Sequence, residues 1–158
     1  MAANLKEDIF MSIKSNHMAN IKSGSKNHEY RKYKLPSSVR RIWFYTTAPT
    51  SAVCYIAEVS HAKEPGEVLE DHGIGNAEFN AGKKVSKYGY EILRLWKLRE
   101  PIRLAKAKAL GYMKGPPQKY CWVKQEVLEH YKVEDQHLLL KGTPREATPE
   151  VTRKTSPS

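Results

Sequence analysis

The sequence predicts an α+β domain built on a β-barrel of five or six strands with short flanking helices. Two observations support this prediction. Stretches rich in β-branched and aromatic residues recur along the chain, and several alternate between apolar and polar side chains as strands do. The helical stretches between them are short, and no internal repeat is found. At 158 residues the chain is long enough for one domain with its own core.

The first elements are a strand, a short helix and a second strand. Residues 8–13 form an apolar run that predicts a strand. Ser15 or Asn16 can cap a helix that Gly24 ends, because these residue types are favoured at the two helix termini. Residues 26–31 then predict a second, polar strand.

The centre of the chain predicts two stronger strands and an acidic segment. Residues 39–46 alternate with a period of two and are rich in β-branched and aromatic residues, which favours a strand. The segment 52–62 is apolar on both faces, so we expect it in the middle of the sheet or barrel. Residues 64–82 are rich in acidic side chains, and Pro65 fits the first turn of a short helix there.

The last part of the predicted domain returns to strands. Residues 87–98 predict a strand, followed by a short helix rich in Ala and Lys that ends at Gly111. Residues 120–123 predict a further strand and 125–131 a closing helix. We therefore expect one compact domain over 8–140. Residues 1–7 and 141–158 have little to bury and are predicted to be disordered.

The charge of the chain favours a polyanionic partner. Lys and Arg number 27 against 17 Asp and Glu, a formal net charge of +10 that attracts nucleic acid before any specific contact forms. No apolar run approaches the roughly 20 residues that span a bilayer, and the N-terminus lacks the apolar core of a secretory signal. Cys54 and Cys121 lie in apolar stretches, which predicts reduced, buried thiols. We expect an intracellular protein, cytoplasmic or nuclear, that is monomeric and does not bind membranes.

A motif near the N-terminus carries a family resemblance. The first predicted strand ends in Ser12-Ile13-Lys14, and the short helix is followed by Gly24, Lys26 and the run Glu29-Tyr30-Arg31. This order of strand, S-I-K, helix and G-x-K-x-x-E-Y-R resembles the opening of ASCH domains, small β-barrels of the PUA-like fold. Three later blocks, at 42–49, 57–59 and 116–118, are similar to ASCH proteins described as predicted transcriptional regulators. Members of the superfamily mostly bind RNA, modified nucleotides or DNA.

The resemblance implies a cleft at one side of the barrel, walled by the first helix and the strand after it. The positions that match this cleft are Ser12, Lys14, Lys26, Glu29, Arg31 and Gln118. Lysines can act as point charges for phosphate, and an arginine can form paired hydrogen bonds with phosphate or a base edge. An internal ion pair between Glu29 and Arg31 is the alternative role of those two residues, and both roles are compatible.

Basic residues alternate with aromatic residues in two parts of the chain. Residues 22–41 hold seven basic side chains and one acidic one, and residues 103–124 hold six basic side chains and no acidic one. Such mixing suits single-stranded or unstacked bases, because cations hold the backbone while rings stack on the bases. Tyr33 and Tyr112 are the aromatic residues that we expect to contact the ligand. The predicted partner is RNA or a modified nucleotide, with duplex DNA as an alternative for a transcription-associated protein.

A hydrolase of the same fold is the second hypothesis. ASCH amidohydrolases that act on acetylated cytidine carry G-x-K-T-x-T, and some other ASCH proteins are described as ribonucleases. Here Lys26 matches the lysine, but Asn27 and Glu29 occupy the two threonine positions, so the nucleophilic hydroxyl is missing. If the protein is a hydrolase, Lys26 and Glu29 are the candidate catalytic residues. The six histidines are scattered, so we expect no metal site and no cofactor.

Overall fold

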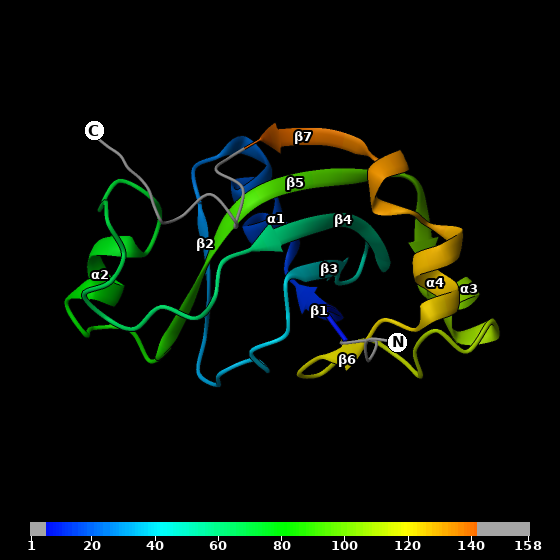
Figure 1. The fold of residues 1–158 in the computed structure, drawn as a ribbon, viewed down its shortest axis with the longest axis horizontal. Coiled ribbons are helices and arrows are strands. Elements are labelled where there is room, and N and C mark those ends of the chain that lie inside the picture. Colours follow the sequence, from blue (N-terminus) through cyan, green and yellow to red (C-terminus); the bar gives the residue numbers. More distant parts are fainter. Residues whose placement is uncertain (1–5, 142–158) are drawn as a thin grey trace, which may run out of the picture.

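The computed structural model describes residues 6–141, which form one mixed seven-stranded sheet with short helices around it (Figure 1). The strand order is β2-β5-β4-β3-β1-β6, and β7 pairs with β5 outside this path. The strands are β1 (Asp8–Ile13), β2 (His28–Arg31), β3 (Arg41–Thr46), β4 (Ala52–Val59), β5 (Tyr88–Arg103), β6 (Cys121–Trp122) and β7 (His137–Lys141). The helices are α1 (Ser15–Ser23), α2 (Asn76–Asn80), α3 (Leu104–Ala109), α4 (Gln125–His130) and a 3-10 turn, η1 (Val133–Asp135).

The strand β4 lies in the middle of the sheet, between β3 and β5, as its apolar faces predicted. It is antiparallel to both neighbours, whereas β1 runs parallel to β3. The long strand β5 pairs with β2, β4 and β7 at different points along its 16 residues. The sheet curls around these pairings into an incomplete barrel, which confirms the predicted α+β barrel class.

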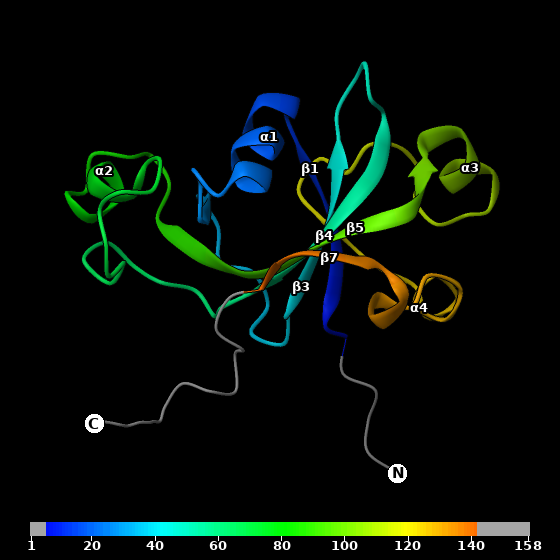
Figure 2. The same cartoon turned by 90° about the horizontal axis from the view of Figure 1, so that it is seen from above.

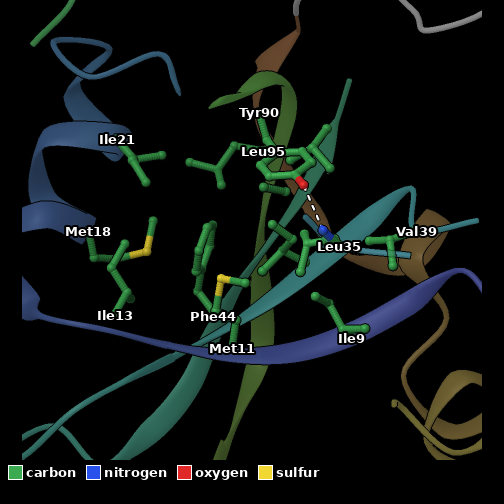
Figure 3. Packing of buried hydrophobic residues seen from close by; sticks show 13 residues of the cluster. Ile9, Met11, Ile13, Met18, Ile21, Leu35, Val39, Phe44, Tyr90 and Leu95 are labelled. Atoms are coloured by element: carbon green, nitrogen blue, oxygen red, sulfur yellow. Dashed lines mark hydrogen bonds between the residues drawn. The ribbon is translucent and has the colours of Figure 1, made fainter. Parts of the chain in front are cut away.

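Side chains alternate along the strands and fill a separate core on each face of the sheet. Ile9, Met11 and Ile13 of β1 belong to one core, whereas Phe10 between them belongs to the other. The first core also takes Met18 and Ile21 from α1 (Figure 3). The second core takes one buried residue each from α3 and α4, Ala107 and Val127. Successive side chains of a strand point to opposite faces of the sheet, so a strand with consecutive apolar residues, like β1, contributes to both cores.

The helix α1 packs on one face of the sheet, whereas α3 and α4 pack on the other. Figures 1 and 2 place α2 at one end of the sheet and α3 with α4 at the other. As predicted, α1 ends at Gly24, whose φ of 88° is a left-handed conformation that glycine adopts without strain. The cap at its start is Lys14 rather than Ser15 or Asn16, because the chain turns into the helix directly at the end of β1.

The secondary structure departs from the sequence predictions in three places. No helix begins at Pro65, where the chain forms turns, and the helix of that segment is α2, which follows Gly75. The strand β7 was not expected, because residues 137–140 are a short apolar run that alone does not distinguish strand from helix. The predicted strand 120–123 is also shorter than expected, since only Cys121 and Trp122 pair with β1.

The described residues test the prediction for the cysteines but not that for the termini. Residues 1–5 and 142–158 lie outside the described residues, so the predicted disorder of both ends is untested. Both cysteines are free and half-buried, and burial raises the pKa of each thiol.

Within residues 6–141, every helix is too short or too polar to cross a bilayer.

Candidate functional site

The curled sheet is not closed by backbone pairing between β2 and β1 in residues 6–141. Side chains bridge this seam instead. Arg31 of β2 donates from Nη2 to the carbonyl oxygen of Ser12 in β1 at 3.1 Å. Farther along, the Tyr33 hydroxyl donates to the carbonyl oxygen of Lys119 at 3.0 Å. A cavity of about 410 Å³ opens at the seam, beside the start of α1.

Five of the predicted site residues line this cavity together: Ser12, Lys14, Lys26, Glu29 and Arg31. They come from the end of β1, the start of α1 and the segment that leads into and through β2. Other polar residues of the lining were missed by the sequence analysis: His17, Thr47, Lys84 and Ser86. They lie on α1 or in the loops that follow β3 and precede β5. Thr47 falls in the block 42–49, which the sequence analysis did not assign to the cleft, and no motif marked the other three. We call this cavity the cleft.

Glu29 is the buried carboxylate of the cleft, with 5 % of its surface exposed. Its Oε2 accepts a hydrogen bond from Arg31 Nη2 at 2.5 Å, so the ion pair that the sequence allowed is present. Its Oε1 lies 3.7 Å from Lys26 Nζ and accepts no hydrogen bond from the described residues. That oxygen is buried, and its partner in the described residues is the Lys26 ammonium, so Glu29 is held between Lys26 and Arg31.

Positive charge dominates the rest of the cleft. Lys14, Lys26, Arg31 and Lys84 face the single carboxylate of Glu29 in the lining. Burial, together with the charges of Lys84 and Arg31, lowers the pKa of Lys26, and Glu29 only partly opposes this shift. An anion in the cleft would relieve the repulsion between these cations, so the electrostatics suit a phosphate or another negative group.

Partial burial also lowers the pKa of His17, and the nearby charges of Lys26, Lys14 and Arg31 act in the same direction. Its imidazole is therefore more readily neutral than usual at neutral pH and can both donate and accept hydrogen bonds. Among residues 6–141, no three side chains of the metal-binding types come together.

The wall formed by Tyr30 is fixed by close packing. The Tyr30 hydroxyl donates to Asn76 Oδ1 at 2.5 Å, and its ring lies 4.5 Å from that of Phe79. Lys84 Nζ lies 5.2 Å from the centre of the same ring, a cation–π contact that holds this lysine at the cleft. A Cβ atom on Gly89 would come within 2.7 Å of the Tyr30 ring, so the absence of a side chain there allows the packing.

Asn27, which occupies a threonine position of the amidohydrolase motif, faces away from the cleft. Its amide nitrogen donates to Glu70, and its Oδ1 accepts from Asn76 Nδ2 at 3.0 Å. His28 is close to Asn27 as well and likewise does not line the cleft. The side chain of Asn27 therefore ties the acidic segment to β2 and offers nothing to a ligand.

The remaining three predicted residues lie elsewhere. Tyr33 is next to the cleft but outside its lining, with Lys119 Nζ 4.5 Å from the centre of its ring. Tyr112 and Gln118 line a second cavity of about 950 Å³, bounded by the loop between α3 and β6. Gln118 follows a Gly-Pro-Pro turn at residues 115–117 that carries the chain past the end of β1, which is why it does not reach the cleft.

The fold matches known structures, although the sequence alone finds no relative. No protein-family model matches the chain, and no curated protein matches it in sequence. The crystal structure of an ASCH protein from Zymomonas mobilis matches with a TM-score of 0.60 and 21 % identity, over 84 % of this chain and 97 % of that one. Two single-residue mutants of that protein match with TM-scores of 0.57 and 0.54, at 21 % and 23 % identity. These cover 82 % and 79 % of this chain, and 99 % and 94 % of the mutant chains. The chain therefore has the fold of an ASCH domain.

Proposed function

We propose that this ASCH-fold domain binds RNA or a nucleotide with a modified base through the cleft, as an intracellular, monomeric binding module. The observation that carries the proposal is the composition of the cleft, in which four cations accompany one buried carboxylate. The cations suit the phosphate of a nucleotide, and the Glu29 oxygen suits an amino or imino group of a base. A role in transcription or RNA processing belongs to the same proposal and is supported by the sequence resemblance.

The dimensions of the cleft support a small ligand or a single residue of a larger one. Its volume of about 410 Å³ is in the lower part of the range of small-molecule sites. A nucleotide recognised in such a cavity must leave its stack, as bases do in single-stranded RNA or when they are flipped out. Duplex DNA with stacked bases fits this geometry less well than a single strand.

Hydrolysis is a second candidate function, favoured by two observations in the cleft. The pKa of Lys26 is lowered, so a larger fraction of this amine is neutral and able to accept a proton than in an exposed lysine. Thr47 and Ser86 supply hydroxyl groups to the same lining, although the sequence motif lacks its threonines. In this function Lys26 would accept a proton, Glu29 would orient or activate the attacking group, and the substrate would be an acetylated nucleoside or an RNA chain.

The test is salt-dependent binding of the purified chain to single-stranded RNA, duplex RNA, duplex DNA, and RNA with acetylated or methylated bases. We expect Lys26→Ala and Arg31→Ala to weaken binding to the preferred ligand at least tenfold. Each should also reduce the slope of log affinity against log salt by about 0.7 if it removes one phosphate contact to a single strand. Lys97→Ala is the control, because Lys97 is exposed on β5 and lines neither cavity.

The same samples are analysed by mass spectrometry for products. Binding without turnover supports the binding module, whereas loss of an acetyl group or chain cleavage that Lys26→Ala abolishes supports the hydrolase. Binding that Lys26→Ala and Arg31→Ala weaken no more than Lys97→Ala does would refute the cleft as the site.

A further inference from the structure

The second cavity, which we call the groove, lies beside the cleft and is not used by the proposed function. Its lining is mostly apolar and includes the rings of Tyr112, Tyr120 and Trp122. Within the part of the chain that the structure describes, the charged side chains of the lining are all lysines: Lys108, Lys114 and Lys124. A hollow with aromatic walls and only positive charges is complementary to a chain of phosphates and bases.

The cleft and the groove meet at the end of β1. Ser12 lines the cleft, and its Oγ donates a hydrogen bond at 2.6 Å to the carbonyl oxygen of Pro117, which lines the groove. Figures 1 and 2 show the yellow segment that precedes β6 passing close to β1 at this point. A hydrogen bond therefore joins a residue of the cleft lining directly to a residue of the groove lining.

A row of half-buried aromatic rings leads from one cavity to the other. Tyr33 lies beside Arg31 at the edge of the cleft, and the Arg31 charge acts on its hydroxyl. The ring centres of Tyr33 and Tyr120 are 6.3 Å apart, and those of Tyr120 and Trp122 are 6.1 Å apart. Lys119, above the Tyr33 ring, adds a cation to this row. The planes of the Tyr33 and Tyr120 rings meet at 32° and those of Tyr120 and Trp122 at 84°, so the row offers bases separate ring faces and edges rather than one continuous stack.

We propose that the groove binds the single-stranded RNA segment adjacent to the nucleotide held in the cleft, so that the physiological ligand is a strand and not a free nucleoside. This inference rests on the proposed function of the cleft. The Tyr33–Tyr120–Trp122 row receives bases, and the lysines of the groove neutralise the phosphates of the same strand. A duplex is disfavoured because its bases are stacked on each other and present no free faces to the rings.

The experiment compares ligands of increasing length that share one nucleotide: a ribonucleoside 5′-monophosphate and single-stranded RNA of two, four and six residues. Affinity is measured at constant salt for the full chain. The groove variant is Lys108→Glu with Lys114→Glu, two exposed side chains whose replacement leaves both cores intact. The matched control is Lys97→Glu with Lys132→Glu, which makes the same charge change at exposed positions outside both cavities.

We expect the affinity of the unaltered chain to rise at least tenfold from the monophosphate to the four-residue RNA. The groove variant should lose at least tenfold for the four- and six-residue RNAs and change less than twofold for the monophosphate. Lys26→Ala should weaken both kinds of ligand. Tyr120→Leu, which keeps the lysines, should also lose affinity for the longer RNAs through the stacking contribution alone.

Each other result overturns a defined part of the argument. Affinity that does not depend on length, or a groove variant that behaves like the control, refutes the groove and leaves the cleft intact. Binding of long RNA that Lys26→Ala does not weaken refutes the cleft and, with it, the shared strand. Tighter binding of duplex RNA, or equal binding of a poly-glutamate chain of the same charge, refutes a single-stranded ligand. A DNA strand of the same sequence shows whether the 2′-hydroxyl contributes.

Discussion

The guanidinium of Arg31 on β2 donates a hydrogen bond to the carbonyl oxygen of Ser12 on β1, across the seam where these two strands are not paired through their backbones. The same nitrogen donates to the buried carboxylate of Glu29. Arg31 therefore has two roles, because it both closes the barrel beside the cleft and fixes the one acidic group inside it. Removal of the side chain should affect the fold and the site together.

Arg31→Lys tests this double role with the charge retained. A lysine ammonium is a compact charge and does not reproduce the planar guanidinium that reaches both acceptors. We expect the free energy of unfolding to fall by about 1–2 kcal/mol, because the Ser12 carbonyl or the Glu29 carboxylate loses its donor. Urea denaturation measures this loss. Lys32→Ala, an exposed neighbour, should change stability by less than about 0.5 kcal/mol, and an equally small effect of Arg31→Lys would contradict the proposed bridging role.

The pH dependence of binding should depend on Lys26. Because its pKa is lowered, Lys26 loses its charge at a lower pH than an exposed lysine. As the pH rises, the affinity for a phosphate should therefore begin to fall before the pH reaches 10.5, the ordinary pKa of a lysine. Lys26→Arg keeps the charge throughout this range and should flatten the decline. The measurement is the affinity for cytidine monophosphate at several pH values from 7 to 10. If the variant and the unaltered chain lose affinity in parallel, a group other than Lys26 titrates.

Acid should destabilise the fold through His28. Burial and the charge of Lys63 lower the pKa of His28 from 6.5 to about 4, and Glu91 only partly opposes them. Between these two pH values the unfolded chain takes up a proton that the folded chain refuses, so stability falls as the pH decreases from 6.5 to 4. The shift corresponds to about 3 kcal/mol.

His28→Gln removes the titrating group, so its free energy of unfolding should decline less over the same pH interval. Urea denaturation at fixed pH gives both profiles. The exposed His61 provides the control variant His61→Gln, whose profile should follow that of the unaltered chain. Equal acid sensitivity of all three proteins would show that other groups cause the loss.

The buried carboxylate of Asp8 should contribute more to the free energy of unfolding than the more exposed carboxylate of its neighbour Glu7. Asp8 accepts hydrogen bonds from Arg41 Nε at 2.7 Å and from Trp43 Nε1 at 2.8 Å, with 3 % of the residue exposed. Asp8→Asn leaves the Arg41 charge without its buried partner and should cost about 3 kcal/mol in urea denaturation. Glu7, 3.7 Å from Arg41 and more exposed, is the control, and Glu7→Gln should cost less than about 1 kcal/mol. Similar costs for the two changes would show that the Asp8 network adds no stability.

Much of the sheet was predictable because its strands carry strong local patterns. The apolar faces of residues 52–62 placed β4 in the centre, and the alternation in 39–46 predicted β3. The strand β7 was not predictable in this way, since its pairing with β5 depends on a long-range contact. The helix assigned to Pro65 was wrong because the turn is fixed by contacts from Asn80, whose Oδ1 accepts from Gly66.

The site was predictable only where a motif lies on adjacent elements. The five cleft residues of the N-terminal motif come together because β1, α1 and β2 follow one another along the chain. Lys84 and Ser86 reach the same cavity from a loop far away in sequence, and no local pattern marks these loop residues as part of a distant site. The separation of Gln118 from the cleft depends on the path of a Pro-Pro turn, which sequence similarity does not show.

The alternation along β1 limits how this protein can change over evolution. Because neighbouring side chains of β1 enter opposite cores, insertion or deletion of one residue would exchange the two sets and expose both cores to misfit. The same strand ends where the two cavities meet. With the length of β1 constant, ligand choice can change by substitution in the cleft lining and in the loops at 82–87 and 111–120.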